Sequence, residues 1–467
     1  MKKFIGSKEF YKGVLAIAVP IMLQNGITNF VGMLDNIMVG LVGTEQMSGV
    51  SIVNQLIFVF NLCIFGGISG AGIFGAQFYG QKNNEGIRAT FRFKLVMCAV
   101  LLLAAIAVFI GYDTQLISLY LHEGSGGGDL AATLEYGEKY LKIMLVGLIP
   151  FTLEQCYSST LRETGETVVP MKASIAAVFI NLVLNYILIY GKCGFPVLGV
   201  EGAAYATVIA RFVQTAIVVI WTHRHLDRNP FMEGAYRSLR IPFSLTRKIL
   251  IMGIPLLLNE GLWASGVAVQ TQCYSVRGLT VIAGLNINST IYNVFTIAFI
   301  ALGDSVAIIA GQLLGAGKLK EAKETAYKII FFSVCCCFGL GSILAGSAHL
   351  FPQIYNTTEE VRTMATWMIR ISAAVMPLQA FLHATYFTIR SGGKTVITFL
   401  FDSVFLWVIA VPAAYLLSYH TKLPVLTVFL LCQLLDGIKA LIGWLIMISG
   451  IWMQNIVGGE TCAVEDN

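Results

Sequence analysis

Twelve long apolar runs, separated by short polar segments, dominate the sequence. Each run has roughly 20 to 30 residues, enough for a helix to cross the hydrocarbon of a bilayer. Backbone groups cannot stay unpaired in lipid, so runs of this length are predicted to be helices. The predicted spans are residues 14–39, 50–79, 94–112, 136–160, 168–190, 199–222, 246–272, 282–314, 328–349, 364–389, 396–418 and 424–450.

The two halves of the pattern repeat one another. Pro20 recurs 235 residues later as Pro255, and Gln77 recurs as Gln312 at the same spacing. Arg162 recurs as Arg390, 228 residues on. The predicted organisation is an N-terminal six-helix lobe at 1–222, a cytoplasmic linker at 223–245, a C-terminal six-helix lobe at 246–450 and a cytoplasmic tail at 451–467.

Six spans in each half mean that both halves enter the membrane from the same side. Parallel repeats of this kind are related by an axis along the membrane normal. The expected fold class is therefore an all-α polytopic membrane protein, with twelve transmembrane helices in two pseudo-symmetric six-helix bundles around a central cavity. This geometry implies transport by rocking of one bundle against the other.

Composition excludes most other classes. Hydrophobic residues make up 56% of the chain and charged residues only 12%, about half the usual share of a soluble domain. With the N-terminus inside, 22 of the 31 Lys and Arg residues fall on the cytoplasmic side and 7 on the other. The positive-inside rule thus predicts a plasma membrane protein with both termini in the cytoplasm and a retained first helix. The basic residues are scattered, so nucleic acid is not an expected partner.

Sequence motifs that usually indicate metal, redox or dinucleotide sites are not meaningful here, because they lie within apolar runs. The ten cysteines include no C-x-x-C pair and lie mostly in apolar runs, so no metal or redox site is predicted. Residues 70–75 match G-x-G-x-x-G but lie inside a membrane run with no strand before them. We therefore expect neither an enzyme nor a cofactor.

Carboxylates inside the apolar runs are the main functional candidates, because charge at bilayer depth is costly. Asp35 lies toward the outer end of the first run, where a carboxyl that burial keeps protonated could carry a proton. An interfacial cap is the alternative. Glu260 follows Pro255 near the midplane of the seventh run. Asp304 either lines the cavity for cationic substrates or pairs with a basic side chain of a neighbouring helix.

Neutral polar residues accompany Asp35 on two other runs. Asn181 and Asn185 are four residues apart and share one helix face, and Thr207 lies on the following run. They could simply join helices through hydrogen bonds. Together with Asp35 they would instead form an oxygen-rich site that suits a proton or a sodium ion.

Several short motifs stand in a fixed order along the chain: Ala76-Gln77-x-x-Gly80 with its echo Gly311-Gln312-x-x-Gly315, Leu161-Arg162-x-x-Gly165-x-Thr167, Asn181-Leu-Val-Leu-Asn185, and Gly199-Val-Glu-Gly202-Ala203-Ala204-x-Ala206-Thr207. This set resembles the multidrug and toxic compound extrusion (MATE) family of secondary antiporters, over essentially the whole chain. The resemblance implies export of amphipathic, often cationic compounds, driven by protons or sodium ions, by a monomer that needs no cofactor.

The resemblance also assigns roles to single residues. Asp35 takes the place of the family's coupling carboxylate, and Asn181, Asn185 and Thr207 lie around its cation pocket. Some relatives carry Asp at Asn185, so the loss of that charge slightly favours the proton. Glu260 resembles a second cation-binding residue, but the Asp that accompanies it in relatives is here Gln379. Bends at Pro20 and Pro255 accompany gating in the family.

Side chains of an adaptable substrate cavity are also expected, because a cation over an aromatic ring gains about 0.5–2 kcal/mol. Ordinary packing is the alternative for each of these residues. A flippase for lipid-linked oligosaccharides is the alternative function, although its pyrophosphate substrates favour more Arg and Lys in the cavity. The candidates for the cavity are Asp304, Gln379, Phe30, Met33, Tyr157, Trp263, Tyr292 and Met376.

Overall fold

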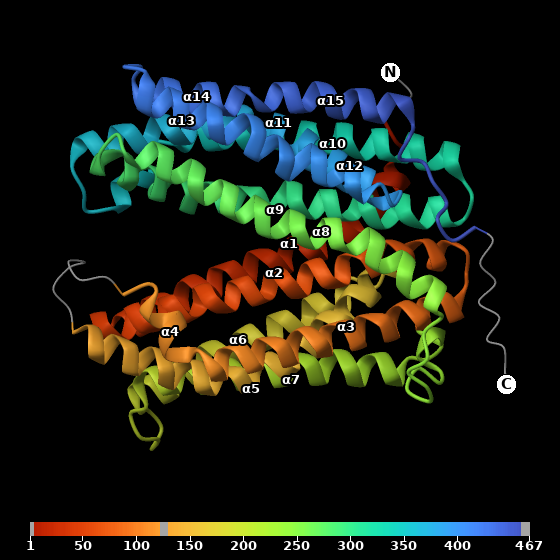
Figure 1. Cartoon of the computed structure of the whole chain (residues 1–467), viewed down its shortest axis with the longest axis horizontal. Coiled ribbons are helices and arrows are strands. Elements are labelled where there is room, and N and C mark those ends of the chain that lie inside the picture. Colours follow the sequence, from red (N-terminus) through yellow and green to blue (C-terminus); the bar gives the residue numbers. More distant parts are fainter. Residues whose placement is uncertain (1–3, 122–128, 459–467) are drawn as a thin grey trace. The chain divides into compact units, whose positions relative to one another are not determined.

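The computed structural model describes residues 4–121 and 129–458, and within these ranges every regular element is helical (Figure 1). The single long helices are α1 (Lys8–Gly40), α2 (Thr44–Gly80), α3 (Asn84–Gly111), α5 (Leu130–Glu163), α6 (Val168–Tyr190), α7 (Gly199–Arg224), α8 (Phe243–Ser275), α9 (Leu279–Gly315), α10 (Leu319–Ser347) and α11 (Glu359–Ser391). The last two predicted spans are built from shorter pieces: α12 (Thr395–Phe399), η3 (Leu400–Val404), η4 (Leu406–Ala410) and α13 (Val411–His420), then α14 (Val425–Leu434) and α15 (Asp436–Ser449).

Eleven of the helices described in these ranges are long and apolar enough to cross a membrane. The remaining predicted span, 136–160, falls on α5, whose first turns carry the exposed pairs Glu135–Lys139 and Glu138–Lys142. Polar residues lower the mean hydropathy of α5, but with 34 residues the helix is long enough to cross a membrane. The prediction of an all-helical, polytopic fold is confirmed.

Helix boundaries differ most from the prediction at α3. The apolar run begins at Lys94, but the helix begins at Asn84, ten residues earlier. The run marks only the apolar part of a helix, whereas the hydrogen-bonded backbone continues into polar sequence. Lys94 therefore lies inside a helix and is fully buried, not in a loop as the count of basic residues assumed.

Residue contacts divide the chain into two compact units. Of the described residues, the first unit contains 4–22, Ala76–Asn83 and 248–458, and the second contains Leu23–Gly75, 84–121 and 129–247. In the first unit α9 packs along α11, and α10 packs against both helices. In the second unit α7 packs against α5 and α6, and α3 packs against α5.

Two glycines bring α2 and α9 into backbone contact in the first unit. A Cβ on Gly80 would lie 1.9 Å from the Gln312 carbonyl oxygen, and one on Gly315 would lie 1.9 Å from the Gln77 carbonyl oxygen. The repeated Gln-x-x-Gly motifs therefore meet each other reciprocally. Only glycine permits this approach.

The same Gln77 side chain holds the segment that follows α15. Its amide nitrogen donates to the Ser391 and Gln454 carbonyl oxygens, and its oxygen accepts from the Ile456 backbone. Trp452 is fully buried in the same unit. The predicted tail at 451–467 thus begins with a packed segment, and its residues 459–467 lie outside the described ranges.

The segment between α7 and α8 is also packed. The Arg92 side chain donates to the carbonyl oxygens of Gly234 and Ala235, each at 2.8 Å, and Phe231 is buried. The Tyr157 hydroxyl hydrogen-bonds with Tyr236 and with His223 Nε2. The linker predicted at 223–245 is thus docked on α3 and α5 for much of its length.

Candidate ion and substrate site

The Asp35 cluster lies in the second unit. It consists of Asp35 on α1, Asn181 and Asn185 on α6, and Thr207 on α7. Asn181 and Asn185 are one helical turn apart on α6 and both are buried. Thr207 lies on α7 and its hydroxyl donates to the Ala203 carbonyl one turn earlier. The helical spacing seen in the sequence thus places both amides on one face.

Two amides approach the Asp35 carboxylate. The Asn185 nitrogen donates to Asp35 Oδ1 at 2.6 Å. In the orientation that turns its nitrogen to Asp35, the Asn181 amide donates to Asp35 Oδ1 at 2.9 Å, and its oxygen lies 3.2 Å from the Thr207 hydroxyl oxygen. The structure therefore brings together all four residues predicted for this site.

Asp35 has no counter-ion in the part of the chain that the structure describes. None of the ion pairs in residues 4–121 and 129–458 includes it, and its hydrogen-bond partners are neutral. Asn185 Oδ1 is buried and has no hydrogen-bond partner within those ranges. The cluster thus combines an uncompensated carboxylate with an acceptor that is free.

A cavity of about 270 Å³ opens beside the cluster within the second unit. Its size is close to the lower end of the usual range for small-molecule pockets, about 300–1,000 Å³. Charge of both signs faces it, from Asp35 on α1 and Arg211 on α7. The cavity is lined by Gly32, Asp35, Asn36, Val39, Val50, Asn54, Tyr140, Met144, Ala203, Thr207 and Arg211.

The C-terminal polar candidates form a different cluster in the first unit. Gln379 on α11 donates to Asp436 Oδ2 at 2.6 Å. Asp436 lies three residues before Lys439, but the Lys439 ammonium group pairs with Asp402 at 2.6 Å. Asp402 lies in the π-helical turn η3, and it also accepts from Asn259, the neighbour of Glu260. This cluster contains its own cation.

The remaining predicted residues are distributed over several helices. Glu260 and Asp304 are half-buried on α8 and α9. Pro20 and Pro255 lie inside α1 and α8, where each removes a backbone donor. Of the aromatic and Met candidates, Tyr157 and Met376 are buried in packing, Tyr292 is partly buried, and Phe30, Met33 and Trp263 are exposed.

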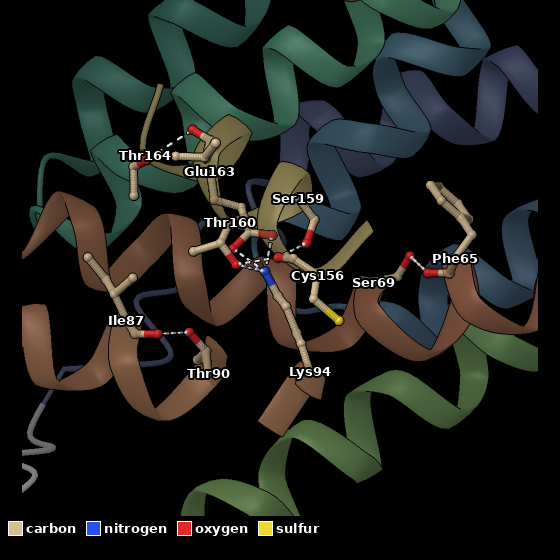
Figure 2. Close-up of polar contacts among 11 residues, drawn as sticks. Phe65, Ser69, Ile87, Thr90, Lys94, Cys156, Ser159, Thr160, Glu163 and Thr164 are labelled. Carbon is tan, nitrogen blue, oxygen red and sulfur yellow. Dashed lines mark hydrogen bonds and ion pairs between the residues drawn. The ribbon is translucent and has the colours of Figure 1, made fainter. Parts of the chain in front are cut away.

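A buried ion pair in the second unit was not predicted from the sequence. Figure 2 shows Lys94 of α3 reaching the end of α5, where its ammonium group lies 2.6 Å from both carboxylate oxygens of Glu163 and 3.0 Å from the Thr160 hydroxyl. Gly75 of α2 leaves room for this carboxylate, since a Cβ there would lie 2.1 Å from Glu163 Oε2. Three helices therefore meet around one charge pair.

Glu154 is a second buried carboxylate that was not predicted as a functional candidate. It lies on α5, is 2% exposed, and accepts hydrogen bonds from Ser158 and Gln155. A single Glu within an apolar run was the available sign, as it was for Glu260.

A repeated helical chain with membrane-length spans and carboxylates within them has the organisation of a polytopic membrane transporter. Comparison with known proteins agrees. The family model described as MatE matches residues 20–187 and 259–416, one segment in each half of the chain. The chain belongs to this family, the multidrug and toxic compound extrusion transporters, and is thus a transport protein rather than an enzyme.

Relatives extend along the whole chain. A protein of Thermotoga maritima described as "Probable multidrug resistance protein NorM" is 25% identical over 460 residues, covering 96% of this chain and 94% of its own. "Probable multidrug resistance protein YoeA" of Bacillus subtilis is 25% identical over 425 residues, 90% of this chain and 89% of its own.

Solved structures share the fold. One, described as the outward-facing conformation of a multidrug resistance MATE family transporter, has a TM-score of 0.84 at 17% identity and covers 96% of this chain and 97% of its own. Another, a MATE in the bent conformation, has the same TM-score and covers 94% of this chain and 95% of its own. None of these similarities supports the alternative of a lipid-linked oligosaccharide flippase.

Proposed function

We propose that the chain is a secondary antiporter that exports amphipathic, often cationic compounds in exchange for protons. The observation that carries this proposal is the Asp35 carboxylate, which lines a cavity and has two neutral hydrogen-bond partners on α6. Asp35 is half-buried, and a charge removed from water without a counter-ion is destabilised. Either a proton or a cationic substrate relieves this instability, so the two ligands compete.

Proton coupling fits the cluster better than sodium coupling. Sodium, a hard cation, needs several oxygen ligands, whereas the amide nitrogens of Asn181 and Asn185 both point at the carboxylate. Sodium binding would require both amides to turn. A proton needs a single new acceptor, and the free Asn185 Oδ1 supplies one when its amide rotates.

Protonation of Asp35 would then change hydrogen bonds on three helices, α1, α6 and α7. A neutral Asp35 gains an O–H donor and keeps part of its acceptor capacity, so the amides of α6, and with them the Thr207 hydroxyl of α7, would change hydrogen-bond partners. Pro20, earlier on α1, weakens that helix at the place where such a change could bend it. Release of the substrate outward and rocking of the two lobes complete the proposed cycle.

Gradient-driven efflux from proteoliposomes tests this proposal. Ethidium is loaded inside, and a proton gradient, a sodium gradient or neither is imposed. We expect efflux with the proton gradient alone. Efflux that follows only sodium would contradict proton coupling, and no efflux under any gradient would contradict antiport itself.

A further inference from the structure

Residues 450–458, which follow α15, form a tail segment that packs into the first unit. The Trp452 side chain is fully buried in a core cluster that includes Leu314 of α9 and Ile329 of α10. The Trp452 carbonyl oxygen lies against the end of α11, since a Cβ on Gly392 would be 1.6 Å from it. The tail segment is therefore fixed to the first unit by its own packing.

Gln77, in the last turn of α2, is bound by this segment. Its side chain is fully buried, and its amide nitrogen donates to the Ser391 carbonyl oxygen at 3.0 Å and to the Gln454 carbonyl oxygen at 3.1 Å. Its oxygen accepts from the Ile456 backbone nitrogen at 2.9 Å. Both donors of the amide and one lone pair of its oxygen are thus engaged.

The tail segment also holds the end of α9. The Asn455 amide nitrogen donates to the carbonyl oxygen of Gly315, the residue that meets α2 through its close backbone approach. The Asn455 oxygen accepts from the Val457 backbone nitrogen at 3.1 Å, which fixes the direction of the amide. The ends of α2, α9 and α11 therefore all contact one short segment.

The helix α2 changes from one unit to the other just before Gln77. Thr44–Gly75 belong to the second unit, and Ala76–Gly80 belong to the first. Rocking of the two lobes would therefore pull the last turn of α2 away from the tail segment. Separation would leave the Gln77 amide and two backbone groups of the tail segment without their partners, and unpaired buried polar groups are costly.

We propose that the tail segment holds the last turn of α2 through Gln77 and keeps the predicted cytoplasmic side of the transporter closed until these hydrogen bonds break. The inference rests on the rocking cycle of the proposed function, and it assigns to Gln77 the control of the balance between two conformations. Contacts that exist in only one of two conformations shift the equilibrium towards it.

Hydrogen–deuterium exchange of the full-length protein in nanodiscs tests this role without a gradient or a dye. Exchange reports local opening of the backbone. It is followed in peptides that cover 77–83 and 312–318, at the predicted cytoplasmic side, and in peptides that cover 40–46 and 275–281, at the opposite side. Rocking opens one side while it closes the other, so a change in the balance moves exchange at the two sides in opposite directions.

Gln77→Met removes the three hydrogen bonds of the side chain and keeps its length. We expect exchange at least threefold faster at the predicted cytoplasmic side and slower at the opposite side. Tyr327→Phe is the matched control, because it removes one hydrogen bond from the Tyr327 hydroxyl to the Met447 carbonyl of α15, a bond that does not involve α2. It should leave exchange at both sides unchanged.

Asn455→Ala is a milder variant that loses the bond to Gly315. It should give the same opposed changes to a smaller extent, and it decides the question if Gln77→Met exchanges faster throughout the chain. Faster exchange at the predicted cytoplasmic side alone would show a purely structural role and overturn the proposal, as would no change at either side. Failure of antiport is distinguishable, since it appears as a lack of gradient-driven efflux whatever the exchange pattern.

Discussion

At the scale of single residues, the charged groups between the helices of the second unit are of two kinds, those with a counter-ion and those without one. Lys94 and Glu163 neutralise each other, and Thr160 adds a hydrogen bond. Asp35 and Arg211 lie beside a cavity, and no ion pair in the described part of the chain includes either of them. The charges of the first kind are satisfied within the protein, whereas those of the second kind are available to ligands.

Replacing Asp35 by Asn should abolish proton-coupled export. The amide cannot be protonated near neutral pH, yet it has almost the same shape and keeps an oxygen that can accept from Asn185. Expression and thermal stability should therefore stay close to those of the wild-type protein, and dye efflux should fall to that of empty liposomes. Glu154→Gln is a control for removal of a buried carboxylate elsewhere in the unit. Full drug export by Asp35→Asn would disprove its coupling role.

Breaking the Lys94–Glu163 pair should destabilise the fold in a non-additive way. Lys94→Met leaves a buried carboxylate without a partner, which typically costs about 3–5 kcal/mol. Glu163→Gln likewise leaves the buried Lys94 ammonium group without a counter-ion, at a similar cost. The double variant removes both charges and should recover much of the loss, as measured by thermal unfolding of all four proteins in detergent.

The exposed Lys139–Glu135 pair on α5 supplies the comparison. Its removal should change stability by no more than about 1 kcal/mol, because solvent screens surface ion pairs. Simple additivity of the Lys94 and Glu163 substitutions would show that the buried pair is not an energetic unit.

At the scale of helices, close backbone contacts determine which side chains are possible at the ends of α2 and α9. The reciprocal approach of Gly80 and Gly315 joins α2 to α9, with the repeated glutamines beside them. The sequence predicted this repeat but not the contact, because spacing alone does not say which copies of a motif touch.

Alanine at Gly80 or Gly315 should separate these helices. A Cβ 1.9 Å from a carbonyl oxygen requires a backbone shift, and overpacking of this kind costs about 1–3 kcal/mol. Gly339→Ala on α10 is the control, since a Cβ added there would have nothing within 4 Å of it. Melting temperatures of the three variants test this; equal values for Gly80→Ala and Gly339→Ala would contradict the contact.

Helix periodicity explains why much of the Asp35 cluster was predictable and the Arg211 cavity was not. Asn181 and Asn185 share a face by spacing alone, and the family resemblance added Asp35 and Thr207. Arg211 stood out only as a basic residue inside a span. Its partners, Gly147 and Phe151, come from α5, and no sequence pattern indicates how α5 and α7 pack. Lys439 pairs with Asp402 on η3 rather than with Asp436 on its own helix, and spacing along the chain could not show this.

At the scale of the whole molecule, the alternation of spans fixes which loops share a side of the membrane. The count of basic residues predicts cytoplasmic termini, and it stays a prediction even though Lys94 no longer counts as a loop residue. The segment between α6 and α7, with the exposed Cys193, should then lie outside the cell, whereas the linker before α8 should lie inside.

Cysteine labelling in intact cells tests this topology. A membrane-impermeant maleimide should label Cys193 in the wild-type protein and lose most of its signal in Cys193→Ser. Asp227→Cys in that background, at an exposed linker position, should react only after the cells are permeabilised. The reverse pattern would invert the predicted orientation.

The buried charge pair on α3 and α5 also constrains how this protein can evolve. Changing either residue alone passes through an intermediate with a stranded charge, whereas changing both together can be nearly neutral. Lys94 and Glu163 should thus be epistatic: closely related sequences should either keep both residues or have replaced both. Gly75, which makes room for the Glu163 carboxylate, should become free to acquire a side chain only in lineages that have lost the pair.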